Sequence, residues 1–597
     1  MEKEAKTRYS KINFAKATDE SINTVGDLER SLTSEYAMMP KQLQIHGEAG
    51  ETGLGITFNG MVVGAIKHPD LIPKWIDFDT YTAEFGGEQH YGHIDTSMAI
   101  PLGIEYTRLR SSEIINRIKQ EGLTAVSKDT GFGTIGVEEE SLHFDHLGNP
   151  VSLEPDEQVE IQDNAMEVAL EPSSSIIEQA LQIAQGRIGE AKRNPDHLIN
   201  STSFSILSKP HEMRMNNGDL APYVNAIVIK WFDEFLTPSD LISRKYWDNI
   251  AGENSFFDYE DMKQYIGNSS FMAFCASHAS LGLRAEQIDG SYCVGLEEAI
   301  AVSDLFNSDF STLLEWMTYS TPLVFGEKIG IDIGDEKKYP KDARAVARLA
   351  IRSTYPGTFI GDTEGYKERI LRSMINGSAD RLDRAGYTAY HEDLDKEIAC
   401  AHGRVRLRAT GGSGKEKFVS PLGRVEFTGG AATPDLIALM SRNAMLKLLG
   451  IASYEALAGG ESPIDYFADK FPSMSTCDEH IELAHAYNFD GTDNPKVAAL
   501  IEEGRAFLSY MRNNYKHEDV EYLIDLAEIG INKLVEDTEA RTLEQYLENP
   551  KGNISDVISN MWEDGYSSLE ISHALTDFER KQSEKLIKYG GNVLSLI

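Results

Sequence analysis

The stretch GVEEESL, residues 136–142, lies in a segment whose apolar and polar side chains alternate, as they do along a half-buried β-strand. Residues two apart on a strand project to the same side. Glu138 and Glu140 therefore present two carboxylates to one face, while Glu139 points to the other. Two like charges this close are unfavourable unless a cation lies between them. The stretch predicts a β-sheet with one acidic, cation-binding face.

Two further segments carry carboxylates in a comparable pattern. A second strand-like segment covers residues 160–171, in which Glu167 and Glu171 share a face. Glu426 lies in a predicted hairpin over residues 403–428. If these strands are neighbours, five or six carboxylates converge on one surface, which suits a hard cation such as Mg²⁺ bound through oxygen. From spacing alone, a solvent-exposed acidic face is the alternative.

Much of the remaining chain has the period of amphipathic helices. Ser173–Ser175 caps a predicted helix, and Glu178 offers a capping-box partner. Together with the strands, these helices predict an α+β fold. The expected helical segments are 111–120, 176–192, a long region from 296 to 317, 435–449, 496–514, 518–534 and 567–588.

Length and composition indicate a large globular protein. The chain has 597 residues, against roughly 100 to 200 for a single domain, and 41% of them are hydrophobic. Lys and Arg total 57 against 95 Asp and Glu, so the formal net charge is −38. Such a surface repels a phosphate backbone, and we do not expect nucleic acid as a partner. Most of the acid excess is expected to be a solvated surface.

The expected location is the cytoplasm. The four cysteines have no CxxC spacing and are too few for a disulfide framework, which suits a reducing compartment. The first residues lack the pattern of a secretory signal, and no apolar run approaches the roughly 20 residues that span a bilayer. We therefore expect a soluble protein with no membrane partner. The sequence leaves the oligomeric state open, with a homo-oligomer as one alternative.

Four short motifs follow one another between residues 130 and 450: GVEEESL at 136–142, MEVALEPS at 166–173, SHASLG at 277–282 and GRVEFT at 423–428. In this order they resemble the motifs of glutamate–cysteine ligases and their carboxylate–amine ligase relatives. Two positions depart from the family pattern. Ser280 stands where the family has a second histidine after His278, and Thr428 stands where it has an arginine after Glu426.

The resemblance implies a catalytic domain like that of glutamine synthetase, an antiparallel sheet curved into a funnel and backed by helices. It implies ATP and Mg²⁺ or Mn²⁺ on the inner face, with Glu138 also counted as catalytic. His278 would be a further metal ligand or a phosphate contact, and Glu171 is the alternative to Glu167 in this alignment. The implied metal ligands are Glu138, Glu140, Glu167 and Glu426.

Basic residues near Glu426 are candidates for contacts with ATP or the substrate. Arginine suits bidentate contact with a phosphate or a carboxylate. Arg424 shares a face with Glu426 and would replace the arginine missing at Thr428, which makes it a catalytic candidate too. Arg406 and Arg408 on the partner strand are further candidates for ATP contacts. The alternative is that these arginines only balance an acidic sheet.

The loop GGSGKE at residues 411–416 resembles a Walker loop only superficially. Ala409 stands where the first Gly of that motif belongs, and Glu416 stands where Ser or Thr ligates Mg²⁺. The loop also lies in a hairpin, not between a strand and a helix. We therefore reject a P-loop but keep Lys415 as a phosphate contact on a mobile lid.

The resemblance implies an ATP-dependent ligase that joins a carboxylate to an amine through an acyl phosphate, with a γ-glutamyl-type amide as product. The acid and the amine would be small molecules or peptides, and the motifs do not select the amine. The alternatives are a catalytically silent binding or scaffold protein with the same fold, and a kinase that uses the same metal–ATP site. We expect an accessory region at 1–125, a catalytic core at 126–455 and a helical region at 456–597.

Overall fold

The computed structural model of the protein describes most of the chain from residue 99 to the C-terminus. The described residues are 99–151, 153, 160–162, 165–202, 204–212, 269–283, 287–288, 291–292, 294–319, 323–324, 405–408, 424–427, 429–475, 479, 483, 486–487 and 491–596, with 57–58, 61–62, 83–85 and 88–90 before them.

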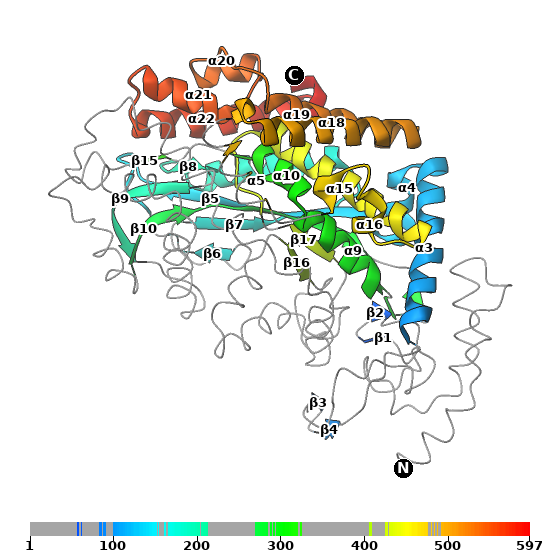
Figure 1. The fold of residues 1–597 in the computed structure, drawn as a ribbon. Coiled ribbons are helices and arrows are strands. Elements are labelled where there is room, and N and C mark those ends of the chain that lie inside the picture. The colour runs from blue at the N-terminus through cyan, green and yellow to red at the C-terminus, as the bar shows by residue number, and fades with distance from the viewer. Residues whose placement is uncertain are drawn as a thin grey trace, which may run out of the picture.

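The central element is a seven-stranded sheet with strand β5 in its interior (Figure 1). Every strand pair in it is antiparallel. The α+β class with an antiparallel sheet is therefore confirmed. The order is β16 (Val405–Arg408), β17 (Arg424–Phe427), β11 (Ser277–Leu283), β5 (Phe132–Phe144), β7 (Ala165–Ala169) and β6 (Glu160–Gln162), and β8 (Leu198–Asn200) also pairs with β5.

Strand β5 has the face pattern that its alternation predicts. Ile135 and Val137 are buried in the main core on one side, and Glu139 follows them on that side. The predicted hairpin over 403–428 is also confirmed, because β16 and β17 pair antiparallel. The prediction of one strand over residues 160–171 is wrong, because this segment contains the two paired strands β6 and β7. Asp163 and Asn164 between them are residue types that favour turns.

Shorter strands lie outside this sheet. Another sheet contains β9 (Phe204–Glu212), β10 (Ser269–Phe274) and β15 (Leu323–Val324), and a third contains β1 (Thr57–Phe58), β2 (Met61–Val62) and β14 (Val294–Gly295). The pairs β3 (Ala83–Phe85) with β4 (Glu88–His90) and β12 (Gln287–Ile288) with β13 (Ser291–Tyr292) complete the described strands.

Each predicted helical segment contains a helix, but the helix predicted at 111–120 begins at Ala99 and the one predicted at 435–449 continues to Gly459. Four short helices of the described chain, at 123–130, 463–467, 543–548 and 554–563, are not among the predicted segments. The long helical region predicted from 296 to 317 is interrupted at Ser308, whose hydroxyl donates to the carbonyl of Leu305. Asn307, Ser308 and Asp309 are residue types whose side chains compete for backbone hydrogen bonds. The helices are α3 (Ala99–Glu121), α4 (Leu123–Thr130), α5 (Ile176–Arg193), α9 (Leu296–Asn307), α10 (Thr312–Met317), α15 (Leu436–Gly459), α16 (Pro463–Phe467), α18 (Pro495–Asn514), α19 (Glu518–Lys533), α20 (Leu543–Glu548), α21 (Ile554–Glu563) and α22 (Ser568–Lys588).

Helices cover one side of the sheet (Figure 1). Helices α5 and α15 pack against β5, and α22 packs on α5. Helix α15 is long and apolar enough to cross a bilayer by length and composition, with a mean hydropathy of 1.3, but its apolar window is 100% buried inside the protein. A predominantly apolar helix that is buried on nearly all sides belongs in a core, and α15 is the central core helix here.

A single large core links the two ends of the described chain. Ile118 of α3, Leu281 of β11, Leu446 of α15 and Ile524 of α19 belong to the same buried cluster. Helices from the predicted accessory and C-terminal regions thus bury their apolar sides against the sheet layer. The division of the chain at residues 125 and 455 stays a prediction.

Candidate metal centre

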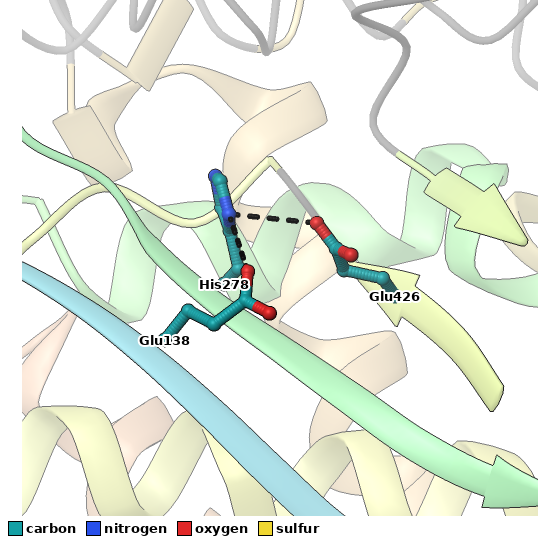
Figure 2. Close-up of side chains that lie close together, drawn as sticks. All are labelled: Glu138, His278 and Glu426. Atoms are coloured by element: carbon teal, nitrogen blue, oxygen red, sulfur yellow. Dashed lines mark ion pairs between the residues drawn. The ribbon is translucent and has the colours of Figure 1, made fainter. Parts of the chain in front are cut away.

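Three side chains from three neighbouring strands meet on the side of the sheet that Glu138 faces (Figure 2). Glu138 comes from β5, His278 from β11 and Glu426 from β17. The Nδ1 atom of His278 lies 3.5 Å from Glu138 Oε2 and 3.4 Å from Glu426 Oε1. One ligand atom from each residue lies within 4.8 Å of the other two. We call these three residues the acid–His cluster.

Strand register explains why these residues meet. His278 is the direct antiparallel partner of Glu138, so both side chains project to the same side of the sheet. Ser280, two residues after His278, is the partner of Glu426. Alternate residues on a strand share a face, and Glu426 therefore lies diagonally across from His278. Three residues that are far apart in the sequence are brought together by the pairing of their strands.

The acid–His cluster is largely withdrawn from solvent. The exposed fractions of the side chains are 15% for Glu138, 6% for His278 and 0% for Glu426. Two carboxylates on one buried imidazole are costly unless a positive charge compensates them. Two carboxylate oxygens and one imidazole nitrogen are donors that divalent metals accept, and Mn²⁺ suits the carboxylates while imidazole is a common ligand of transition metals. The donor set therefore fits a divalent cation.

Arg424 lies beside the acid–His cluster. Its Nη2 atom is 3.7 Å from Glu138 Oε1, and 30% of its side chain is exposed. Its buried Nε has no hydrogen-bond partner within the described part of the chain. The guanidinium thus borders the cluster on one side and reaches solvent on the other, a position in which it can contact an anionic ligand.

Glu140 and Glu167 form a second acidic pair next to this cluster. They are direct partners in the register of β5 and β7. Glu140 is buried, and its Oε2 accepts a hydrogen bond of 2.7 Å from the amide of Ala276, so this carboxylate also ties β5 to the start of β11. Glu167 is partly exposed. Glu171, the alternative to Glu167, is exposed beyond the end of β7.

Some predicted residues are described only in part or not at all. Arg406 is the register partner of Glu426, and Arg408 is the partner of Arg424, but only the backbone of β16 is described. Lys415 and Thr428 lie outside the described residues. The roles that the sequence suggested for these residues stay predictions.

Two buried arginines lie behind the sheet, and their roles were not predicted from the sequence. Arg187 of α5 donates to the carboxylate of Glu139, and Arg442 of α15 donates to Ser277. Burial raises the pKa of Glu139, and the charge of Arg187 acts against this rise. A glutamate on the core side of a strand was a signal for such a partner, because a buried carboxylate needs a cation or several hydrogen bonds.

No protein-family model matches the chain, and the search of curated proteins found no match. Among solved structures, a bifunctional glutathione synthetase from Pasteurella multocida is similar with a TM-score of 0.39 and 11% identity, over 76% of this chain and 53% of that chain. This chain therefore spans about half the length of that protein. A glutamate–cysteine ligase from Francisella tularensis in complex with AMP is similar with a TM-score of 0.25 and 10% identity, over 78% of this chain and 96% of that chain. These TM-scores are too low to establish a shared fold.

Proposed function

We propose that this protein is an ATP-dependent carboxylate–amine ligase whose acid–His cluster holds a divalent cation. One observation carries the proposal. Residues of three of the four ligase-like motifs, Glu138, His278 and Glu426, lie on adjacent strands with their ligand atoms within 4.8 Å of one another. Motifs that matched by chance would have no reason to place these residues together.

The chemistry of the cluster suits phosphoryl transfer. Such transfer needs mainly the positioning of the reactants and the neutralisation of phosphate oxygens. A divalent cation held by Glu138, His278 and Glu426 supplies that neutralisation when it is bound. Glu426 is fully buried, so its carboxylate presents a fixed ligand atom and not a mobile surface charge. Glu140 and Glu167 on the same side of the sheet are proposed as further acidic ligands.

The proposed reaction has two steps. An oxygen of the substrate carboxylate attacks the γ-phosphorus of ATP, the bond to the bridging oxygen breaks, and ADP leaves. The amine nitrogen then attacks the carbonyl carbon of the acyl phosphate, inorganic phosphate leaves, and the nitrogen loses a proton to give the amide. Arg424 is proposed to hold an anionic oxygen of the acid or of the phosphate, since it combines exposure with proximity to Glu138. Arg406, Arg408 and Lys415 are proposed as further phosphate contacts.

The finer features follow from the sequence resemblance. We propose that the sheet belongs to the glutamine synthetase type of funnel and that Mg²⁺ or Mn²⁺ is the cation. We propose small-molecule or peptide acids and amines as substrates in the cytoplasm, with a γ-glutamyl-type amide as product. Nucleic acid and membranes are not proposed as partners.

One observation favours a second candidate function. Ser280 occupies the position between Glu426 and Gly136 in the register, where the resembled family has its second histidine. A hydroxyl there removes one imidazole from the face that carries the cluster. A protein that keeps the fold and binds the nucleotide without turnover is therefore the second candidate.

Release of ADP tests the proposal. The wild type is incubated with ATP, Mg²⁺ and a panel of acids and amines, beside Glu138→Gln, which keeps the shape of the side chain and removes its charge. Glu121→Gln, an exposed change at the end of α3, is the matched control. We expect ADP, phosphate and an amide from the wild type and the control, and no turnover from Glu138→Gln.

Mass spectrometry of the products separates the alternatives. A stable phosphorylated acid without an amide would indicate a kinase. ATP binding without ADP release over the whole panel would indicate the silent binding protein. Turnover by Glu138→Gln at the wild-type rate would contradict the assignment of the site.

A further inference from the structure

We propose that Arg187 and Arg442 are positioning residues that hold two ligand-bearing strands, β5 and β11, and the chain after the third, β17, from the opposite side of the sheet. Neither arginine belongs to the acid–His cluster or to any of the four motifs. The inference deepens the proposed function and rests on it in one respect, because its readout is cation affinity at the cluster.

Arg187 connects β5 to the segment that follows β17. Its Nε donates to Glu139 Oε1 at 3.0 Å, and its Nη2 also donates to this carboxylate. Its Nη1 donates to the carbonyl of Pro434 at 2.9 Å, and its Nη2 donates to the carbonyl of Thr433 at 2.7 Å. Glu579 of α22 lies 3.8 Å away on the same guanidinium. One buried side chain thus joins the strand of Glu138, the chain after Glu426 and the C-terminal helix.

Arg442 holds β11 in the same way. It is fully buried, and its Nη1 donates to the carbonyl of Ser277 at 2.6 Å while its Nη2 donates to the hydroxyl of Ser277 at 3.2 Å. Its Nε donates to the side-chain oxygen of Asn443 at 3.1 Å. Gly430 makes room for it, because a Cβ atom there would lie 2.1 Å from Nη1. Gly430 itself accepts the amide hydrogen of Ser277, so Arg442 lies where β11 and the chain after β17 meet.

The two anchored residues are the chain neighbours of two cluster residues. Glu139 follows Glu138, and Ser277 precedes His278. Neighbouring Cα atoms lie about 3.8 Å apart, and their side chains point to opposite faces of the strand. An anchor on the rear residue therefore fixes the origin of the front side chain without contact with it. Such support matters because the side chains of a binding site have to be held within about 0.5 Å of the geometry that binds.

The charge of Arg442 argues against a purely space-filling role. Its hydrogen-bond partners are the neutral groups of Ser277 and Asn443, and burial lowers its pKa to about 9. A well-packed apolar side chain at such a buried position is often equally or more stabilising than a charged one. An apolar side chain would lack the donors that the guanidinium presents in one plane and with which it bonds Ser277.

Titration with Mn²⁺ tests the inference on the full chain. We compare the wild type with Arg187→Lys and Arg442→Lys, which keep the charge and lose the fork of donors. Arg110→Lys is the matched control, because Arg110 is equally buried in an ion pair with Glu298 and contacts β11 at Leu283, away from His278. Residues that support metal ligands typically change affinity about 10- to 100-fold when mutated. We expect Mn²⁺ affinity to fall at least tenfold in the two test variants, and to stay within about twofold of the wild type in the control.

Calorimetry gives the Mn²⁺ affinity of each variant, and thermal unfolding without metal, run in parallel, gives its stability. The two measurements together separate a positioning role from a purely structural one. Wild-type affinity in both test variants would overturn the inference while leaving the proposed cation site intact. An equal loss of affinity in Arg110→Lys would also overturn it, since any buried arginine would then have the same effect. No Mn²⁺ binding by the wild type would remove the proposed site and this inference with it. If Arg442→Lys does not fold, Ser277→Ala removes the hydroxyl contact and keeps the carbonyl contact, so a smaller loss of affinity is expected there. Wild-type affinity in both Arg187→Lys and Ser277→Ala would then overturn the inference.

Discussion

Removal of the Arg187 guanidinium has an effect on folding that can be estimated from the structure. In Arg187→Met the carboxylate of Glu139 stays buried, with 9% of its side chain exposed, and loses its ion-pair partner. The carbonyls of Thr433 and Pro434 lose a donor as well. Breaking a buried pair by removing one partner typically costs about 3–5 kcal/mol in the free energy of unfolding. We expect a loss of about 4 kcal/mol, since the methionine fills part of the space of the arginine.

Urea unfolding followed by tryptophan fluorescence measures this loss, because Trp316 is fully buried and stacks on Tyr487. The double variant Glu139→Leu/Arg187→Met removes the orphaned carboxylate too, so it should recover at least about 2 kcal/mol of the loss. A loss below about 1 kcal/mol in Arg187→Met would refute the reasoning. Additive losses in the double variant would refute it too, because they would show that Glu139 and Arg187 do not depend on each other.

Three further predictions concern the residues around this framework. Burial raises the pKa of Glu579 to about 7, against 4.5 for the free group, so the folded state binds more protons between these values and stability falls as pH rises from about 4.5 to 7. Glu579→Gln should remove this fall. Between pH 5 and 7.5, the difference in the free energy of unfolding between wild type and variant, taken from melting curves, should change by at most about 3 kcal/mol. A difference that stays constant with pH would contradict the raised pKa of Glu579. Gly430→Ala places a methyl group 2.1 Å from Arg442 Nη1 and 2.7 Å from the carbonyl of Ser277, and should cost about 1–3 kcal/mol in urea unfolding, whereas a neutral result would mean that Arg442 moves freely. Ser175→Ala removes the hydroxyl that accepts from the Glu178 amide at the start of α5, and should cost about 1 kcal/mol; Ser175→Gly should cost less, and equal losses would argue against a capping role.

Local patterns in the sequence predict the strands and the faces of their residues. Alternation over 134–144 is enough to place Glu138 and Glu140 on one side of β5 and Glu139 on the other, since the side-chain period of a strand is two. The extents of α5, α18, α19 and α22 follow in the same way from apolar spacing and caps. The end of α15 does not, because a helix buried on nearly all sides has no amphipathic period to mark its length. Short polar residues also interrupt a pattern, as Ser308 does between α9 and α10.

Register between distant strands is the part that local patterns do not contain. His278 is opposite Glu138 only because β11 pairs with β5 at that offset, over a sequence separation that periodicity does not address. The same holds for Glu140, whose carboxylate accepts from the Ala276 amide instead of joining the cluster of three. The bond between Arg187 and Glu139 was not predicted, because the alternation of the strand places Glu139 on the rear face without indicating its partner.

Glu138, His278 and Glu426 are proposed to hold a divalent cation together. Calorimetric titration of the full chain with Mn²⁺ tests this proposal most directly, with Glu426→Gln as the variant and the exposed Glu121→Gln as the matched control. We predict saturable binding by the wild type and by Glu121→Gln, and at least a tenfold weaker affinity for Glu426→Gln, because a buried ligand has lost its charge. No saturable binding by the wild type, or equal affinity in Glu426→Gln, would contradict the proposal.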